Sequence, residues 1–132
     1  REAPVNSIWE GSGNVIGLDV LRVIGREPEA LAALMAELEK GRGSDDHLDR
    51  AIDDLARELG HPEKIEARMR TITEMMALTL QGALLVQYAP AAVAQAFCLS
   101  RLGSRYRGAF GTLPKECDLS ALIARAAPGS SA

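Results

Sequence analysis

The chain has 132 residues, of which 47% are hydrophobic, 25% charged and only 4% aromatic. This length allows one domain with a buried core, and the scarcity of aromatic residues favours helices over sheets. No apolar run long enough to span a membrane and no signal-peptide pattern is present in the sequence, so we expect a cytoplasmic protein without a membrane partner.

Charge is distributed unevenly along the chain, whose net charge is −3. Residues 1–60 carry seven basic and thirteen acidic side chains, whereas residues 61–132 carry eight basic and five acidic ones. A basic second half is compatible with a nucleic-acid surface, although a solvated basic face is the commoner cause. Cys98 and Cys117 have no partner at metal-ligand spacing, so we expect free thiols and no metal site.

Glycine and proline residues separate the predicted helices. The segment 1–13 contains turn signals and predicts an extended stretch that ends in a tight turn. A first helix over residues 14–25 is apolar nearly all round, which indicates burial on most sides. A second helix over residues 28–42 begins at a proline and ends among glycines.

The second part of the chain continues the helical pattern. Apolar residues at helical spacing predict a third helix over 44–60 that begins at Ser44, and a long fourth helix over 62–88. A fifth helix follows over 90–103, and a short sixth begins near Asp118. The fold class we expect is all-α: an antiparallel helical bundle of five helices plus a short C-terminal sixth, in a helical domain over 14–126 before a disordered tail at 127–132.

The most specific stretch is the turn formed by Trp9, Glu10 and Gly11, just before the first predicted helix. It places one carboxylate beside a large aromatic ring. The positive end of a helix dipole stabilises an acid in this position. The residue pattern alone therefore leaves Glu10 either as a partner of the helix dipole or as a functional carboxylate.

This turn also carries a resemblance to a known family. The stretch 4–14 resembles the acyl-CoA dehydrogenase family, most closely its AidB-type, alkylation-response branch, and the similarity continues more loosely at 18–22 and 94–98. The resemblance implies the C-terminal domain of an FAD-dependent enzyme that performs α,β-dehydrogenation of an acyl-CoA thioester as a homotetramer. The family's upstream helical and sheet domains are missing from this chain, so we expect the chain alone to be inactive.

The resemblance assigns roles at the matching positions. Glu10 is implied to be the base that removes the α-proton of the thioester. Gly11 lets the backbone approach the cofactor, and Ser12 and Asn14 stand where the family has FAD-contacting Thr and Gln, keeping the hydroxyl and the amide. Trp9 replaces the usual Tyr and either packs on the flavin, narrows the acyl channel or anchors the turn.

Two other classes of function stay open. The AidB-type branch is associated with DNA binding and protection from alkylation, with only weak dehydrogenase activity. The basic cluster of Arg101, Arg105 and Arg107 predicts contacts to the phosphates of DNA, CoA or FAD, unless these residues form ordinary surface ion pairs. Broad apolar stripes on the first and fourth predicted helices favour a third class, a non-catalytic oligomerisation bundle.

Overall fold

The computed structural model describes residues 12–103 and 113–127, and every regular element in these two stretches is helical. The all-α prediction is confirmed. In chain order, the elements are α1 (Ser12–Arg26), α2 (Pro28–Glu39), α3 (Asp46–Leu59), α4 (Ile65–Tyr88), α5 (Ala91–Phe97), the π-helical turn η2 (Cys98–Leu102) and α6 (Leu119–Ala126).

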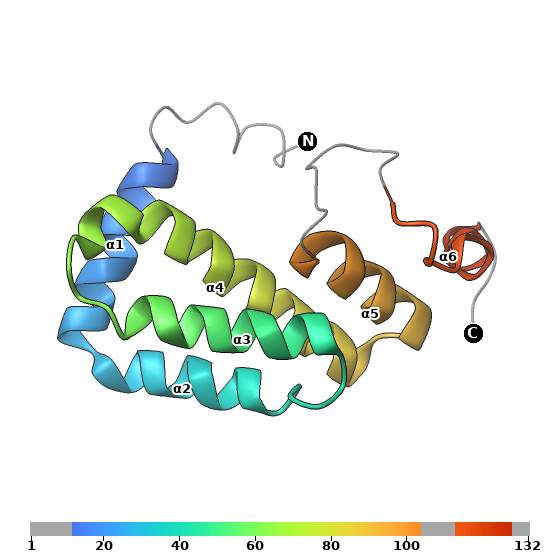
Figure 1. The fold of residues 1–132 in the computed structure, drawn as a ribbon, viewed down its shortest axis with the longest axis horizontal. Coiled ribbons are helices and arrows are strands. Elements are labelled where there is room, and N and C mark those ends of the chain that lie inside the picture. Colours follow the sequence, from blue (N-terminus) through green and yellow to red (C-terminus); the bar gives the residue numbers. More distant parts are fainter. Residues whose placement is uncertain (1–11, 104–112, 128–132) are drawn as a thin grey trace.

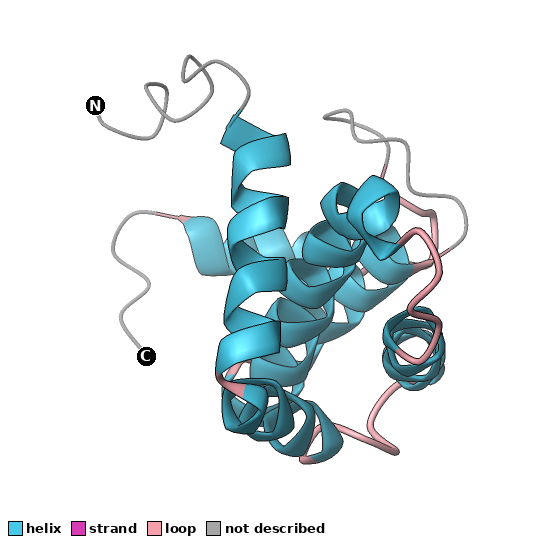
Figure 2. Cartoon of the chain, turned by 90° about the vertical axis from the view of Figure 1, so that its left-hand side faces the viewer, coloured by secondary structure: helices cyan, strands magenta, loops and turns pink. Residues whose placement is uncertain are grey.

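The long helix α4 is the element around which the others are arranged (Figure 1). Successive helices α2, α3 and α4 run in alternating directions, and α4 packs against both of its predecessors as well as α1 and α5. The α1 helix lies at one end of the bundle, whereas α5 and α6 lie at the other. Figure 2 views the molecule from the α1 end, where α1 stands across the other helices.

The hydrophobic core lies between α2, α3, α4 and the start of η2. Its fully buried side chains are Leu38, Leu48, Ile52, Leu55, Met69, Ile72, Ala83 and Cys98. The predicted stripe of α3 is therefore confirmed as its inward face. This helix is capped by Asp45, whose carboxylate accepts hydrogen bonds from the backbone N–H groups of His47, at 2.8 Å, and Leu48, at 3.3 Å. The predicted cap, Ser44, was wrong by one residue.

Helix α1 differs from its prediction in two respects. It begins at Ser12 rather than Asn14, so Gly13 is helical instead of part of the turn. It is also not buried on most sides, because its main packing partners within the described residues are α4 and α2. Four of its large apolar side chains are between 42% and 56% exposed: Val15, Ile16, Leu18 and Val23.

Gly17 is the point at which α1 comes closest to α4. A Cβ atom added there would lie 3.2 Å from the backbone N of Arg70 and 3.2 Å from the carbonyl carbon of Met69. Those are backbone atoms, which cannot move aside as the end of a flexible side chain can. The absence of a side chain at Gly17 therefore allows the two helices to touch backbone to backbone.

The predicted fifth helix is α-helical only in its first part. From Cys98 to Leu102 the chain widens into the π-turn η2, in which the Gly103 N–H donates to the Cys98 carbonyl at 3.0 Å. The Ser100 hydroxyl donates to the Ala96 carbonyl at 2.5 Å, a bond that competes with regular helix pairing. Helical periodicity predicts that this segment is helical, but it cannot predict the wider turn.

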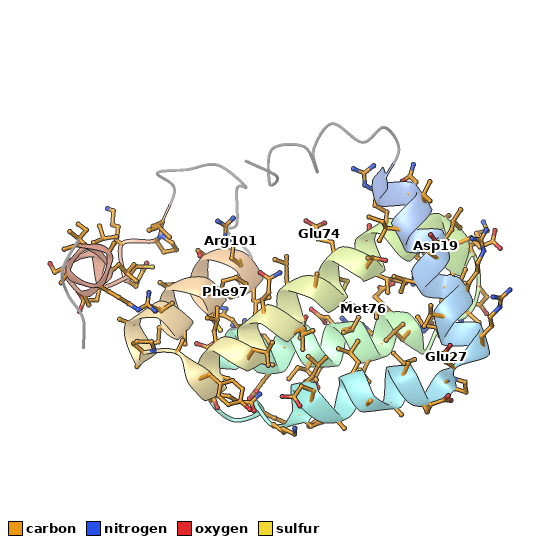
Figure 3. All side chains as sticks on the ribbon, turned by 180° about the vertical axis from the view of Figure 1, so that it is seen from behind. Asp19, Glu27, Glu74, Met76, Phe97 and Arg101 are labelled. Atoms are coloured by element: carbon orange, nitrogen blue, oxygen red, sulfur yellow. The ribbon has the colours of Figure 1, made fainter. Side chains whose placement is uncertain are left out.

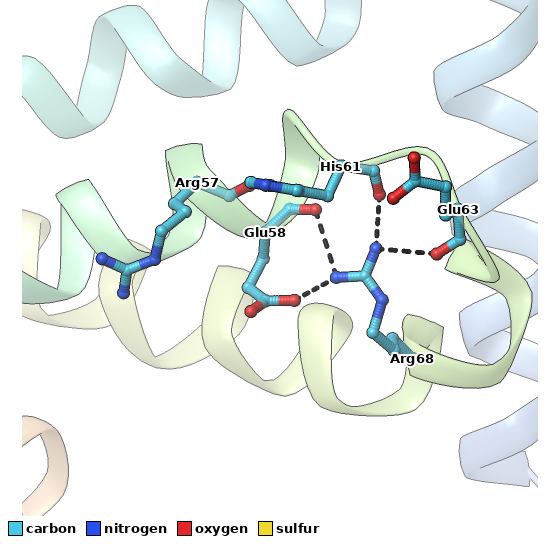
Figure 4. A network of polar contacts seen from close by, with 5 residues as sticks. All are labelled: Arg57, Glu58, His61, Glu63 and Arg68. Carbon is cyan, nitrogen blue, oxygen red and sulfur yellow. Dashed lines mark hydrogen bonds and ion pairs between the residues drawn. The ribbon is translucent and has the colours of Figure 1, made fainter.

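A network around Arg68 joins the end of α3 to the start of α4 (Figure 4). The guanidinium donates to the Glu58 carboxylate and carbonyl, to the His61 carbonyl, and at 3.3 Å to the Glu63 carbonyl. These acceptors include carbonyls at the end of α3, where the helix itself supplies no donors. The α4 helix begins only at Ile65, after the His61 and Glu63 carbonyls that accept from Arg68, rather than at 62 as predicted.

No helix in the two described stretches combines the length and apolar character that crossing a membrane requires.

Candidate functional site at the start of α1

The predicted turn and the described structure meet at the first residues of α1. Trp9, Glu10 and Gly11 lie outside the described residues, so their predicted roles stay predictions. Ser12 is the first residue of α1, and its side chain also lies outside what the structure describes. Asn14 is in the first turn of the helix with an exposed side chain. Its amide is therefore accessible to a ligand.

The N-terminus of α1 presents backbone donors to the predicted turn. The first N–H groups of an α-helix have no acceptor within the helix, and together they form its positive end. No acidic side chain occupies the first turn of α1. Because Glu10 and Gly11 directly precede Ser12 in the sequence, a group bound at the turn would lie near these donors.

Arg70, on α4, is a candidate that the sequence analysis missed. Its guanidinium lies beside Gly13, because a Cβ atom at Gly13 would be 3.4 Å from Nε and 3.5 Å from Cζ of Arg70. The structure thus adds a cation to the donors at the start of α1. No local pattern links the two positions; only the crossing of α1 and α4 brings them together.

The predicted basic cluster lies elsewhere. Arg101 is partly buried in η2 and extends away from the helical ribbons (Figure 3), whereas Arg105 and Arg107 lie outside the described residues. Figure 3 shows Arg101 next to α5 and Asp19 of α1 at the other end of the bundle. The structure therefore separates Arg101 from α1.

The two cysteines are free thiols with little nucleophilic character. Cys98 is buried, and loss of solvation, followed by the nearby charge of Asp45, raises the pKa of its thiol to about 12. Loss of solvation and Glu116 also raise the pKa of Cys117. Both thiols stay protonated at neutral pH. In the described stretches no three His, Cys, Asp or Glu side chains gather so that they could hold a metal ion.

An all-helical bundle whose first helix begins directly after the sequence Trp-Glu-Gly is the arrangement expected of an acyl-CoA dehydrogenase C-terminal domain. The chain is 41% identical over 105 residues to "Putative acyl-CoA dehydrogenase AidB" of Escherichia coli, and this match covers 80% of the chain. The chain belongs to the AidB-type acyl-CoA dehydrogenase-like proteins. It spans only 19% of the length of that relative. No family model and no solved structure matches the chain.

Proposed function

We propose that this domain works within a longer FAD-dependent flavoprotein that dehydrogenates acyl-CoA thioesters, with Glu10 as the base that removes the α-proton. The observation that supports the proposal is the start of α1 at Ser12, two positions after Glu10 in the sequence, because the first turn of a helix has unpaired N–H groups. A positive helix end favours the ionised form of a neighbouring carboxylate, and only that form accepts a proton.

The donors at the start of α1 fit a cofactor rich in acceptors. The amide of Asn14, the hydroxyl of Ser12 and the guanidinium of Arg70 would donate to FAD, whose ring and phosphates accept hydrogen bonds. When bound, FAD accepts the hydride that leaves the β-carbon. The first-turn N–H groups would meanwhile stabilise the negative charge that develops on the thioester as Glu10 takes its α-proton.

The substitution Glu10→Gln in the longer flavoprotein tests this role. It keeps the size of the side chain and its hydrogen bonding but removes the charge that accepts a proton. We expect normal folding and FAD content, with flavin reduction by acyl-CoA slowed by a factor of about 10² to 10⁴. The measurement is the loss of flavin absorbance after rapid mixing with an acyl-CoA thioester.

A matched control is Glu27→Gln, which removes an exposed carboxylate between α1 and α2 that makes no capping hydrogen bond. We expect this variant to reduce its flavin at the parental rate. Reduction of the Glu10→Gln variant at the parental rate would contradict the assignment of the base. A loss of about 0.3–1 kcal/mol of stability with unchanged reduction would instead identify Glu10 as a partner of the helix dipole.

DNA binding, together with protection of DNA from alkylation, is the second candidate function. The observation that favours it is the basic excess of residues 61–132, with Arg101 at the α5 end of the bundle. We expect weak binding to duplex DNA that falls steeply with added salt. Replacing Arg101, Arg105 and Arg107 by Ala should abolish the fluorescence anisotropy change of a labelled duplex at low salt. Undiminished binding by the triple variant would place the DNA surface elsewhere.

The exposed apolar side of α1 supports a homo-oligomer, with a tetramer as the form that the family resemblance implies. Apolar side chains gathered on one helix are a common feature of subunit interfaces. In this role the bundle would hold subunits together whether or not it also contributes to catalysis.

A further inference from the structure

A cavity of about 320 Å³ opens between α3, α4 and η2. This volume is at the lower end of the range found for small-molecule sites. Its lining combines apolar and nitrogen-bearing side chains. The apolar residues include Met75, Leu78 and Leu102, and the nitrogen-bearing ones are His47, Arg50 and Arg101.

The hydrogen bond between Arg50 and His47 determines which nitrogen of the imidazole can donate to a ligand. Arg50 Nη2 lies 2.9 Å from His47 Nδ1. A guanidinium only donates hydrogen bonds, so Nδ1 must accept, and the neutral imidazole then carries its hydrogen on Nε2. The Cε1 atom, which is bonded to both ring nitrogens, lies 3.7 Å from the Cβ position of Gly103 at the end of η2. The imidazole ring therefore lies beside the end of η2.

The charges on the wall favour an anion. Two arginines, Arg50 and Arg101, line the cavity from different elements, one from α3 and one from η2. The lining also includes the carboxylate of Asp54, which is already paired with Arg57. The lining therefore includes two arginines and a histidine, and its one acidic residue, Asp54, forms an ion pair with Arg57.

The π-turn explains how η2 contributes both kinds of contact. Arg101 and Leu102 are consecutive, yet both line the cavity. Leu102 is pressed onto α4, because a Cβ atom at Gly82 would lie 2.9 Å from its Cδ1. Single π-turns within helices occur frequently at functional sites, where they change the direction of a side chain. Here the turn ends the helix with an apolar contact and a cation on the same cavity.

We propose that this cavity binds a small amphipathic anion: a phosphate monoester whose organic part is compact and apolar. The phosphate would accept hydrogen bonds from Arg50, Arg101 and His47, and the apolar part would lie on Met75 and Leu78. This site goes beyond the proposed dehydrogenase function. Its lining residues belong to α3, α4 and η2 and not to α1, and it needs no flavin.

The test is a titration of the 132-residue chain with phenyl phosphate, followed by two-dimensional nitrogen-15 NMR. We expect saturable shifts of the Leu78 and Leu102 amides with a Kd on the order of 1 mM, as is reasonable for so small a ligand. Inorganic phosphate, which lacks the apolar part, and benzyl alcohol, which lacks the charge, should each bind at least about tenfold more weakly.

The Arg50→Gln and Arg101→Gln variants should each weaken phenyl phosphate binding by about tenfold, as expected for one lost charge-assisted hydrogen bond. The matched control, Arg26→Gln, removes the same charge at the far end of α1 and should bind as the parent does. Unchanged spectra elsewhere establish that each variant is folded.

Three results would overturn the proposal. One is unaltered binding by both cavity variants. Another is equal affinity for inorganic phosphate, which would indicate a charge cluster without a ligand pocket. The third is a short DNA duplex that shifts the same amides while phenyl phosphate does not, which would assign this surface to nucleic acid.

Discussion

Helices α1 and α3 are of similar length but use their apolar residues differently. The α3 helix has charged residues on one side and buries Leu48, Ile52 and Leu55 completely on the other. The α1 helix is apolar over most of its surface, yet the described bundle leaves its large side chains partly in solvent. Apolar content alone therefore does not decide burial; the number of neighbouring elements does.

The difference separates two purposes of apolar surface. On α3 the apolar stripe stabilises the bundle itself, because each buried side chain removes apolar area from water. On α1 much of the apolar area is not removed from water within the described residues. Patches of this kind mark contacts with other protein surfaces. Three substitutions test the comparison.

The largest expected effect is on α3. Replacing Ile52 by Ala leaves a cavity in the core and should lower the free energy of unfolding by about 2–5 kcal/mol. Urea unfolding followed by far-ultraviolet circular dichroism measures the change. The control, Ala56→Ser on the exposed side of the same helix, should stay within about 0.5 kcal/mol of the parent. A loss below about 1 kcal/mol for Ile52→Ala would mean that α3 does not anchor the core.

An intermediate effect is expected where α1 touches α4. Gly17→Val would push side-chain carbons against the backbone of Met69 and Arg70, and should cost about 1–3 kcal/mol of unfolding free energy. Gly25, near the other end of α1, has nothing within 4 Å of its Cβ position, so Gly25→Ala should instead stabilise the chain by up to about 1 kcal/mol. If urea unfolding showed that both variants are more stable than the parent, this would contradict the close contact between α1 and α4.

The smallest effect on stability is expected on the exposed side of α1. Ile16 is 51% exposed, so Ile16→Ser should change the unfolding free energy by no more than about 0.5 kcal/mol. Its effect should appear in light scattering as a lower average mass, provided that the chain self-associates through this face. If the variant had the same mass distribution as the parent, the apolar side of α1 would not be part of a subunit interface.

Elements defined by local signals were predictable from the sequence. The α3 helix follows from its apolar spacing and its acidic start, and Pro28 correctly marks the first residue of α2. The exposure of α1 was not predictable, because periodicity shows which residues are apolar but not how many neighbours cover them. The widening at η2 was not predictable either, and neither was the packing of Leu102 against Gly82, which is a contact between separate helices.

The candidate sites also differ in whether a local sequence signal or a contact between separate helices defines them. Glu10 and its neighbours stand out because their order along the chain is itself the motif. Arg70 reaches Gly13 only because α1 crosses α4, and His47 and Arg101 line one cavity only because α3 lies beside η2. Neither pair has a fixed spacing in the sequence, so no local pattern indicates it.

The Arg68 network has a consequence for the way the bundle opens. One guanidinium on α4 holds the carbonyls of Glu58, His61 and Glu63, so the last turn of α3 cannot fray without losing contacts made by α4. Local opening in a protein proceeds in cooperative units that share such contacts. The last turn of α3 and the first turn of α4 therefore form one unit for hydrogen exchange, and their amides should gain or lose protection together.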